Sequence, residues 1–418
     1  MQYIDMVRNQ PSHKTALITE TAVYTYGDLW QKAMNIRKTI TPKRRVHRIP
    51  STNIAMQLCQ FLAYSGSTTV PIMATTASMR QPLSVDLEVP PMACMGVMTS
   101  GSTGPSKILW RDFASWAHFF PIQNHIFGLT ERTILLCQGS LAFTGNLNLY
   151  LGVLSVGGTI VGMDSFHPKT WLSYIERYQV NAIYLIPAKL FLLPQIAQSV
   201  YPTVQHMISG SQAMGKQQAQ WLQQIFPHSE IILYYGASEL NYITYIKDID
   251  MTEDSSVVGK PFPGVDVAVD AKTQDIVITT PYHVLNVSVP TSLHDRGYID
   301  TKGNLHFLGR SGDCCNVNGR HVSRYRIEQA VCEHMPVREA AVLVQHRDRA
   351  DVLTVIVGGA TVPVTRAMLW KTLRPYLQDD EIPKACIVMD RLPKNESGKI
   401  DRPALEKYIY FRNQHDVI

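Results

Sequence analysis

Short β-branched or aromatic runs alternate with segments of helical spacing from residue 27 to residue 236. The expected helices are residues 27–40, 170–179 and 215–226, and the expected strands are residues 133–137, 159–163, 181–187 and 230–236. Alternation of this kind is typical of α/β layers in which most strands are parallel. The sequence therefore predicts an α/β fold for this part of the chain.

The pattern changes near Pro261, after which the expected strands at 265–270 and 275–280 have little between them. This spacing indicates a small antiparallel sheet or barrel that closes the large domain. A helix, two strands, a helix and a strand follow, over residues 323–334, 339–346, 351–359, 365–377 and 385–390. We therefore predict a large N-terminal domain of layered α/β subdomains with a β-barrel-like part over residues 1–310, and a small C-terminal α+β domain over residues 311–418.

The composition is that of an ordinary globular protein. The chain has 418 residues, 45% of them hydrophobic and 17% charged, and it is too long for a single core. Lysine and arginine number 39 against 34 for aspartate and glutamate, and this small excess gives no case for a nucleic-acid partner. The seven cysteines contain no C-x-x-C pair, and we find neither a secretory leader nor an apolar run of about 18 residues. We expect a cytoplasmic protein without a membrane span.

The stretch TSGSTGPSK, residues 99–107, concentrates glycine, serine and threonine. Small residues let backbone N–H groups approach an oxyanion closely, hydroxyl groups add donors, and Lys107 would supply a positive charge. A phosphate is therefore the natural ligand for this loop, although a solvated turn explains the same composition. The stretch matches neither the Gly-x-x-x-x-Gly-Lys-Ser/Thr phosphate loop nor the Gly-x-Ser-x-Gly nucleophile turn.

Five further stretches follow this loop: ISGSQAM at 208–214, YYGASE at 234–239, SVVGKPFPGVDVAV at 256–269, LHDRGYIDTKGNLHFLGRSGD at 293–313 and LPKNESGKIDR at 392–402. Together with the loop, and in the same order, they resemble the motifs of the adenylate-forming superfamily. That superfamily includes acyl- and aryl-CoA synthetases, peptide-synthetase adenylation domains and firefly luciferase. The resemblance covers most of the chain, and it implies a short stand-alone acyl-AMP ligase with a mobile C-terminal lid.

The resemblance implies which residues bind ATP and Mg²⁺ and which act in catalysis. The β- and γ-phosphates would be held by Thr99, Ser100, Gly101, Ser102, Thr103, Gly104 and Lys107. Glu239 would contribute to Mg²⁺ binding, with Ser238 near the phosphates. Lys399 would stabilise the negative charge that gathers when a carboxylate attacks the α-phosphorus. In the family a proline usually stands directly before the loop lysine, whereas here Pro105 and Ser106 stand in the other order.

The same resemblance assigns residues to the adenine, the ribose and the hinge. Adenine and the acyl pocket would be framed by Ser209, Gly210, Ser211, Tyr234, Tyr235 and Gly236, although core packing explains the tyrosines almost as well. Asp295 would accept hydrogen bonds from the ribose, and Arg310 would reach the ribose or a phosphate unless it forms a structural salt bridge. Asp300 is the rival of Asp295, but a turn-capping role suits it better. Asp313 resembles the hinge residue, and Gly319 lies in the loop that would approach a thiol.

Residues 143–158 align with a family motif that begins Phe-Asp in amino-acid-activating domains, where the aspartate pairs with the α-ammonium group of the substrate. Thr144 stands at that position here. A buried ammonium without a partner is strongly unfavourable, so an α-amino acid is disfavoured. We expect a fatty or aromatic carboxylic acid, with Phe143, Asn146 and Ile186 as further pocket residues, and the tyrosines tilt the choice towards an aryl acid.

The expected reaction is that of an AMP-forming ligase. A carboxylate and Mg-ATP give acyl-AMP and pyrophosphate, and a pantetheine thiol of CoA or of an acyl carrier protein then displaces AMP. The phosphate loop comes earlier than is typical of the family, which indicates a shortened N-terminal subdomain and leaves the acceptor open between CoA and an acyl carrier protein. An acidic carrier protein would suit the excess of positive charge on this chain. Two other interpretations stay open: transfer of the acyl group to an amine or another acceptor, and nucleotide binding without ligase activity.

Overall fold

The computed structural model describes residues 2–41, 45–80, 87–98, 107–317, 320–347, 350–379, 381–395 and 400–415. The chain divides into two units, Met1–Val267 with Ile278–Thr291, and Ala268–Val277 with Ser292–Ile418. The domain boundary that the sequence predicts after residue 310 falls inside the second unit and stays a prediction.

The main sheet of the first unit has the strand order β13-β12-β11-β10-β9-β7-β8-β1-β2. From β11 to β1 each strand is parallel to its neighbour, whereas β2, β12 and β13 pair antiparallel. The strands are β1 Thr15–Ile18, β2 Val23–Thr25, β7 Ile134–Gln138, β8 Thr159–Met163, β9 Ala182–Tyr184, β10 His206–Gly210, β11 Glu230–Ala237, β12 Asn241–Lys247 and β13 Val257–Pro261. The predicted α/β architecture is confirmed.

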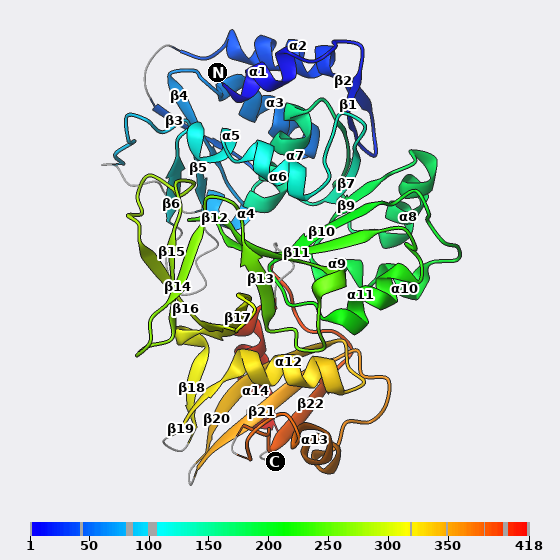
Figure 1. Ribbon diagram of the computed structural model, residues 1–418, viewed down its shortest axis with the longest axis vertical. Coiled ribbons are helices and arrows are strands. Elements are labelled where there is room, and N and C mark those ends of the chain that lie inside the picture. The colour runs from blue at the N-terminus through cyan, green and yellow to red at the C-terminus, as the bar shows by residue number, and fades with distance from the viewer. Residues whose placement is uncertain are drawn as a thin grey trace. The chain divides into compact units, whose positions relative to one another are not determined.

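Helices pack on both faces of this sheet (Figure 1). One group contains α8 Pro168–Arg177, α9 Pro187–Leu190, α10 Leu193–Ile196 and α11 Lys216–Gln223. The other contains α1 Tyr3–Arg8, α2 Tyr26–Arg37, α3 Ile54–Tyr64, α5 Ala114–Ala117, α6 Phe120–Ile126 and α7 Thr144–Ser155. In α8, a proline occupies the first turn and Trp171, Leu172 and Ile175 are buried in the core, because this spacing gives the helix one apolar face.

Successive side chains of β11 lie on opposite faces of the main sheet and pack against different helices. Ile231 and Leu233 belong to the core cluster that contains the buried residues of α8 and α11. Because successive strand residues point to opposite faces, Tyr234 lies on the other face. Its ring contacts Phe127, which directly follows α6, with centroids 6.2 Å apart. Tyr234 therefore faces the group of helices that includes α6 and α7.

A second sheet of the first unit has the order β3-β4-β5-β6 and was not predicted from the sequence. Its strands are β3 Arg45–Ile49, β4 Thr69–Met73, β5 Met95–Met98 and β6 Ile108–Arg111. The short helix α4 Thr76–Met79 follows β4. Because β5 and β6 pair antiparallel, with Met98 opposite Ile108, the glycine-rich stretch 99–107 connects two neighbouring strands.

The second unit contains two groups of elements. The first is β14 Asp266–Val269, β15 Asp275–Thr279, β16 Thr291–Ile299 and β17 Leu305–Arg310. The second is η2 Ser311–Asp313, β18 Cys314–Val317, β19 Arg320–Ser323, α12 Arg324–His334, β20 Glu339–Arg347, β21 Ala350–Gly358, α13 Arg366–Leu373, β22 Ala385–Met389 and α14 Arg402–His415. The sheet β20-β21-β22 and helices α12 and α13 share one apolar core. The predicted small α+β part is confirmed.

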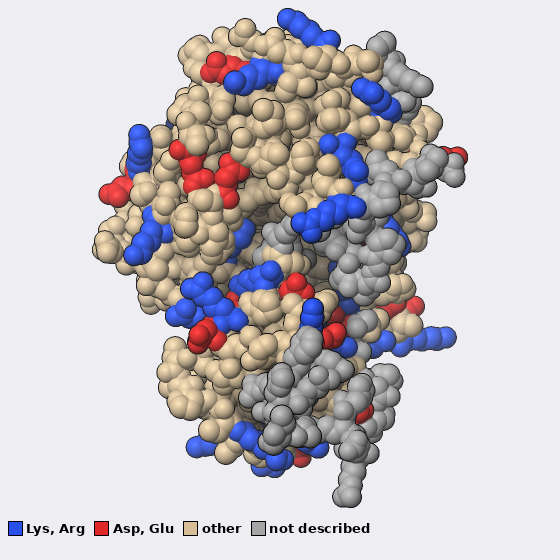
Figure 2. Space-filling view, turned by 180° about the vertical axis from the view of Figure 1, so that it is seen from behind, with Lys and Arg blue, Asp and Glu red and all other residues tan. Residues whose placement is uncertain are grey.

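The charged side chains are interspersed with uncharged ones on the face that Figure 2 shows. The chain carries a formal net charge of +5. Within the described ranges, every helix is too short or too polar to pass through a lipid bilayer.

Candidate active site

The turn between β11 and β12 carries Ser238 and Glu239. The two strands pair antiparallel up to Ala237 and Asn241, and Asn241 has a φ of 66°, in the left-handed region. A Cβ at Gly236 would lie 2.6 Å from the Asn241 carbonyl oxygen, so glycine is required for this close approach. The hairpin therefore presents Ser238 and Glu239 at its tip.

A buried arginine fixes this turn. Arg111, the last residue of β6, is 0% exposed. Its Nη2 donates to the Ser238 carbonyl at 2.7 Å, and its Nη1 donates to the Tyr282 carbonyl at 2.9 Å and to Ser115 Oγ at 3.3 Å. Burial lowers the pKa of Arg111 to about 10, although the negative charge of nearby groups that include Glu239 acts to raise it. Arg111 therefore stays charged at neutral pH and holds the backbone of the turn.

Residues 282–286 connect the turn to β6. One backbone N–H of this segment donates to the Glu239 carbonyl at 2.8 Å, and the next donates to the Trp110 carbonyl at 2.7 Å. Asn286 continues the contact, because its Oδ1 accepts from the Trp110 N–H at 3.2 Å. Lys107 is the exposed residue directly before β6. The strand that follows Lys107 and the turn that carries Glu239 are thus joined by one segment.

Helix α7 begins beside the same turn. Its first residue is Thr144, whose Oγ1 lies 3.1 Å from Ser238 Oγ. Phe143 precedes the helix with an extended backbone. Asn146 is 5% exposed, and its amide donates to the Ser140 carbonyl at 3.0 Å. The structure therefore brings Thr144 next to Ser238, while their roles towards the acid and the phosphates stay predictions. The Asn146 amide fixes the loop after β7.

The small-residue turn at the end of β10 combines buried and exposed serines. Ser209 is 0% exposed, and its hydroxyl donates to the Leu185 carbonyl at 2.7 Å. A Cβ at Gly210 would lie 2.5 Å from the Tyr234 ring, so glycine leaves room for this ring. Ser211 is exposed and has a φ of 69°. The turn therefore offers a ligand its backbone and Ser211 rather than the Ser209 hydroxyl.

Asp295 and Arg310 face each other on β16 and β17 in the second unit. Asp295 Oδ1 accepts a hydrogen bond from Arg310 Nε at 2.8 Å. Asp295 is 1% exposed, while the Arg310 side chain is 58% exposed. Arg310 therefore forms the salt bridge that was the alternative to a ligand role, and the ribose contact of Asp295 stays a prediction.

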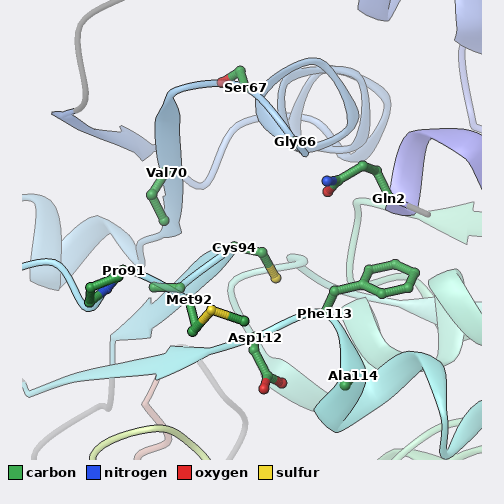
Figure 3. Close-up of a pocket in the computed structure, with 11 residues that line it drawn as sticks. Gln2, Gly66, Ser67, Val70, Pro91, Met92, Cys94, Asp112, Phe113 and Ala114 are labelled. Atoms are coloured by element: carbon green, nitrogen blue, oxygen red, sulfur yellow. The ribbon is translucent and has the colours of Figure 1, made fainter.

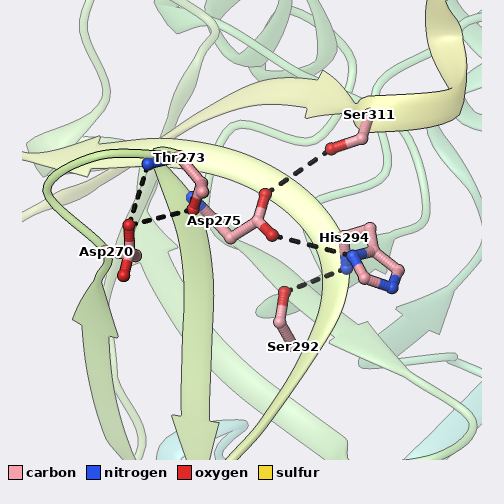
Figure 4. A network of polar contacts seen from close by, with 6 residues as sticks. All are labelled: Asp270, Thr273, Asp275, Ser292, His294 and Ser311. Atoms are coloured by element: carbon pink, nitrogen blue, oxygen red, sulfur yellow. Dashed lines mark hydrogen bonds and ion pairs between the residues drawn. The ribbon is translucent and has the colours of Figure 1, made fainter.

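A polar network supports the residue before Asp295 (Figure 4). His294 has a φ of 60°, and its backbone N–H donates to Ser292 Oγ at 3.0 Å. Its Nδ1 lies 3.6 Å from Asp275 Oδ2. The other oxygen of Asp275 accepts from Ser311 Oγ at 3.5 Å. The network therefore ties the start of η2 to β15 and β16.

Asp300 caps a turn between β16 and β17. It accepts hydrogen bonds from the backbone N–H groups of Asn304 and Lys302, both at 2.8 Å, and from the Asn304 amide at 3.1 Å. The backbone hydrogen bond from Asn304 makes the largest contribution to lowering the pKa of Asp300, to about 2. The turn-capping interpretation of Asp300 is confirmed.

Several predicted residues lie outside the described ranges, and their roles stay predictions: Thr99, Ser100, Gly101, Ser102, Thr103, Gly104, Gly319 and Lys399. Among the described ones, Asp313 ends η2, Tyr235 is half-buried on β11 and Ile186 is buried directly before α9.

Sequence reasoning missed Arg111 and the buried tyrosines Tyr184 and Tyr242. Arg111 directly follows the apolar run ILW, a position that indicates the end of a strand and gives no signal of its buried role. The tyrosines carried no signal beyond their aromatic character, because their partners come from other strands.

A pocket of about 410 Å³ lies elsewhere in the first unit (Figure 3). It is lined by Cys94, Asp112 and Phe113 among others. Burial raises the pKa of Cys94 to about 12, so its thiol is not a ready nucleophile. The lining contains no residue assigned to the nucleotide or the acid, and we give this pocket no role in the site.

The fold and the assembled motifs are those of an adenylate-forming enzyme. The family model described as AMP-binding enzyme matches residues 64–280, more than half of the chain, and the model of the AMP-binding enzyme C-terminal domain matches residues 326–399. The chain therefore belongs to the family of AMP-binding enzymes.

Individual relatives agree with this membership. The uncharacterized acyl–CoA ligase YhfT of Bacillus subtilis (strain 168) is 26% identical over 332 residues, which are 74% of this chain and 67% of the relative. The putative long chain fatty acid-CoA ligase VraA of Staphylococcus haemolyticus (strain JCSC1435) is 26% identical over 336 residues, 78% of this chain and 72% of the relative.

Solved structures show the same fold. The o-succinylbenzoate CoA synthetase MenE of Bacillus subtilis, in complex with the acyl-adenylate intermediate OSB-AMP, has a TM-score of 0.80 at 17% identity, over 96% of this chain and 97% of that chain. Its complex with ATP and magnesium ion has the same TM-score and identity, over 97% and 99%.

Proposed function

We propose that the protein activates a carboxylic acid with ATP, forming acyl-AMP and releasing pyrophosphate, and then transfers the acyl group to a pantetheine thiol of CoA or of an acyl carrier protein. One observation carries the proposal: the turn with Ser238 and Glu239 meets α7 at Thr144 and is tied to the strand that follows Lys107. Three motifs far apart in the sequence thus converge. Family membership and the acyl-CoA ligase relatives support the same reaction.

The reaction balances in two steps. A carboxylate oxygen of the acid attacks the α-phosphorus of ATP, and the bond to pyrophosphate breaks. The thiol then attacks the acyl carbon, and AMP leaves. Lys399 and Lys107 would offset the negative charge that gathers in the first step, because fixed cations stabilise a transition state of higher charge density.

The donor atoms of the turn fit a magnesium ion. Glu239 is half-buried and directly follows Ser238, whose hydroxyl lies 3.1 Å from that of Thr144. Within the described ranges, no cluster of three or more His, Cys, Asp or Glu side chains forms a protein cage for a metal. Mg²⁺ commonly binds through one or two carboxylates together with substrate phosphates. Glu239 would supply the carboxylate, and the ion would neutralise phosphate charge.

The acid is not an α-amino acid in this proposal. Thr144 offers a hydroxyl, already paired with Ser238, where an α-ammonium group would need a carboxylate. A fatty or aromatic acid needs no such partner. The acceptor thiol of CoA and that of a carrier protein have the same chemistry, so the two are distinguished by assaying each.

The proposal is tested by pyrophosphate release from Mg-ATP across aryl, fatty and amino acids. We expect release with one class of acid and a loss of at least about a hundredfold in Lys399→Ala, because removal of a charge-stabilising group has effects of this size. Lys407→Ala, an exposed lysine of α14, is the matched control and should retain the wild-type rate. ATP binding without release from any acid would contradict the proposal and favour a nucleotide-binding protein without ligase activity.

A further inference from the structure

Three buried tyrosines line the face of the main sheet that is covered by α7. Tyr184 on β9, Tyr234 on β11 and Tyr242 on β12 are 2%, 8% and 3% exposed. The hydroxyls of Tyr184 and Tyr234 lie 2.7 Å apart, and the rings of Tyr234 and Tyr242 meet edge to face with centroids 4.4 Å apart. The Tyr242 hydroxyl donates to Asn148 Oδ1 on α7 at 3.1 Å. We call Tyr184, Tyr234 and Tyr242 the tyrosine wall.

The tyrosine wall stands directly against the first turn of α7. A Cβ at Gly145 would overlap the Tyr184 hydroxyl, so glycine at this position lets the tyrosine approach the helix backbone. The preceding residue, Thr144, contacts Ser238 of the candidate active site. Asn148, which anchors Tyr242, comes four residues after Thr144, about 6 Å along the helix axis. The wall therefore begins within about one helical turn of the place where Thr144 meets Ser238.

The wall is rigid for two reasons. Its rings pack on one another and on Phe127, whose ring centroid lies 5.4 Å from that of Tyr242, and a close-packed interior does not yield volume without displacement. Burial also raises the pKa of Tyr184 and of Tyr242 well above its ordinary value. The hydroxyls stay neutral, and moving either ring would break a hydrogen bond in surroundings where water does not replace it.

We propose that the tyrosine wall restricts the substrate to a short aliphatic carboxylic acid. The inference rests on the proposed function, with the carboxylate activated beside Ser238 and Glu239 and the rest of the acid directed along α7. From Thr144 to Asn148, where Tyr242 is anchored, the helix rises about 6 Å, which is about the length of a chain of four carbons. An octyl chain or a benzene ring would need the volume of Tyr184 or Tyr234. The wall thus argues against the aryl acid that the tyrosines favoured when only the sequence was considered.

The test measures pyrophosphate release by the full chain with acetate, butyrate, octanoate and benzoate. We expect kcat/KM for butyrate to exceed that for octanoate and for benzoate by at least about tenfold, which is the discrimination that a closed apolar pocket provides. Tyr184→Ala removes the ring next to Gly145 and should raise the octanoate-to-butyrate ratio by about tenfold or more. Tyr184→Phe keeps the ring and loses the hydroxyl, so it should preserve the wild-type order of acids.

The outcomes separate this inference from the function on which it rests. Wild-type activity with octanoate or benzoate that equals or exceeds activity with butyrate overturns the short-acid inference and leaves adenylation standing. Absence of release with every acid overturns adenylation itself. Thermal unfolding of each variant identifies a loss of folding, and Tyr184→Leu, which opens less space, provides a second shift in the same direction. An octanoate-to-butyrate ratio that stays at the wild-type value in both folded variants, Tyr184→Ala and Tyr184→Leu, also overturns the inference.

Discussion

Replacing Arg111 with methionine is expected to lower kcat/KM for Mg-ATP by about a hundredfold, because small misplacements of active-site groups have effects of this size. Arg111 is 0% exposed and donates to two backbone carbonyls, those of Ser238 and Tyr282. The apolar side chain fills similar space but leaves both carbonyls without this donor. We therefore also expect the free energy of unfolding to fall by about 3 kcal/mol. Pyrophosphate release and urea unfolding measure the two effects.

The controls separate positioning from simple stability. Arg111→Lys keeps a positive charge but cannot donate from a planar fork to two carbonyls, so it should recover only part of the activity. Arg132→Met removes an arginine whose side chain is 90% exposed, and it should leave both quantities near wild type. If Arg111→Met, assayed well below its melting temperature, retains wild-type kcat and KM for Mg-ATP, then Arg111 contributes to folding and does not position Glu239.

Arg111 also shows what sequence motifs omit. The motifs identify Lys107 and Glu239 separately, and each motif is local. The contact between the two regions is made by residues 282–286 and by the Arg111 guanidinium, which is buried among carbonyls. An arginine after an apolar run reads as the end of a strand exposed to solvent, since charged residues are seldom fully buried. Its role follows only from the tertiary contacts.

The tyrosine wall could not be predicted from the sequence for a similar reason. Tyr234 was assigned to the pocket from its motif, but Tyr184 and Tyr242 were not assigned. Their strands, β9 and β12, flank β10 and β11 in the sheet, and the sequence gives the strands without their spatial order. The alternation of residues does predict that Tyr234 and Leu233 face opposite sides. Which side belongs to α7 depends on the crossover connections.

The second sheet was missed because its strands lack the expected composition. β3 has the sequence RVHRI, in which three of the five residues are Arg or His, and β4 contains Pro71. Proline lacks the N–H that a central strand donates, so it argues against such a strand. β4 nevertheless lies between β3 and β5, with all five residues buried. Burial by tertiary packing outweighed the local propensity here.

Replacing Arg402 with methionine is expected to destabilise the second unit by about 3 kcal/mol. Glu328 is 8% exposed; its carboxylate accepts from Arg402 Nη2 at 2.7 Å and from the Val342 N–H at 2.7 Å. The substitution leaves a buried carboxylate without its cation. Arg402 ends the motif that contains Lys399, so the same variant should also slow adenylation. Urea unfolding measures the stability, and pyrophosphate release measures the activity.

The pH dependence distinguishes loss of the ion pair from loss of packing. Burial raises the pKa of Glu328 above its ordinary value of 4.5, although the hydrogen bond from Arg402 acts to lower it. Without Arg402, the pKa of the Glu328 carboxyl in the folded protein rises further above its value in the unfolded chain. The protonated carboxyl therefore stabilises the folded variant below pH 4.5, and this stability is lost as the pH rises towards neutrality. The deficit relative to wild type should therefore grow between these limits. Glu328→Gln combined with Arg402→Met should recover stability at neutral pH, whereas exposed Arg391→Met should behave as wild type. A deficit that is equal at both limits would mean that Arg402 acts through its aliphatic stem rather than through its charge.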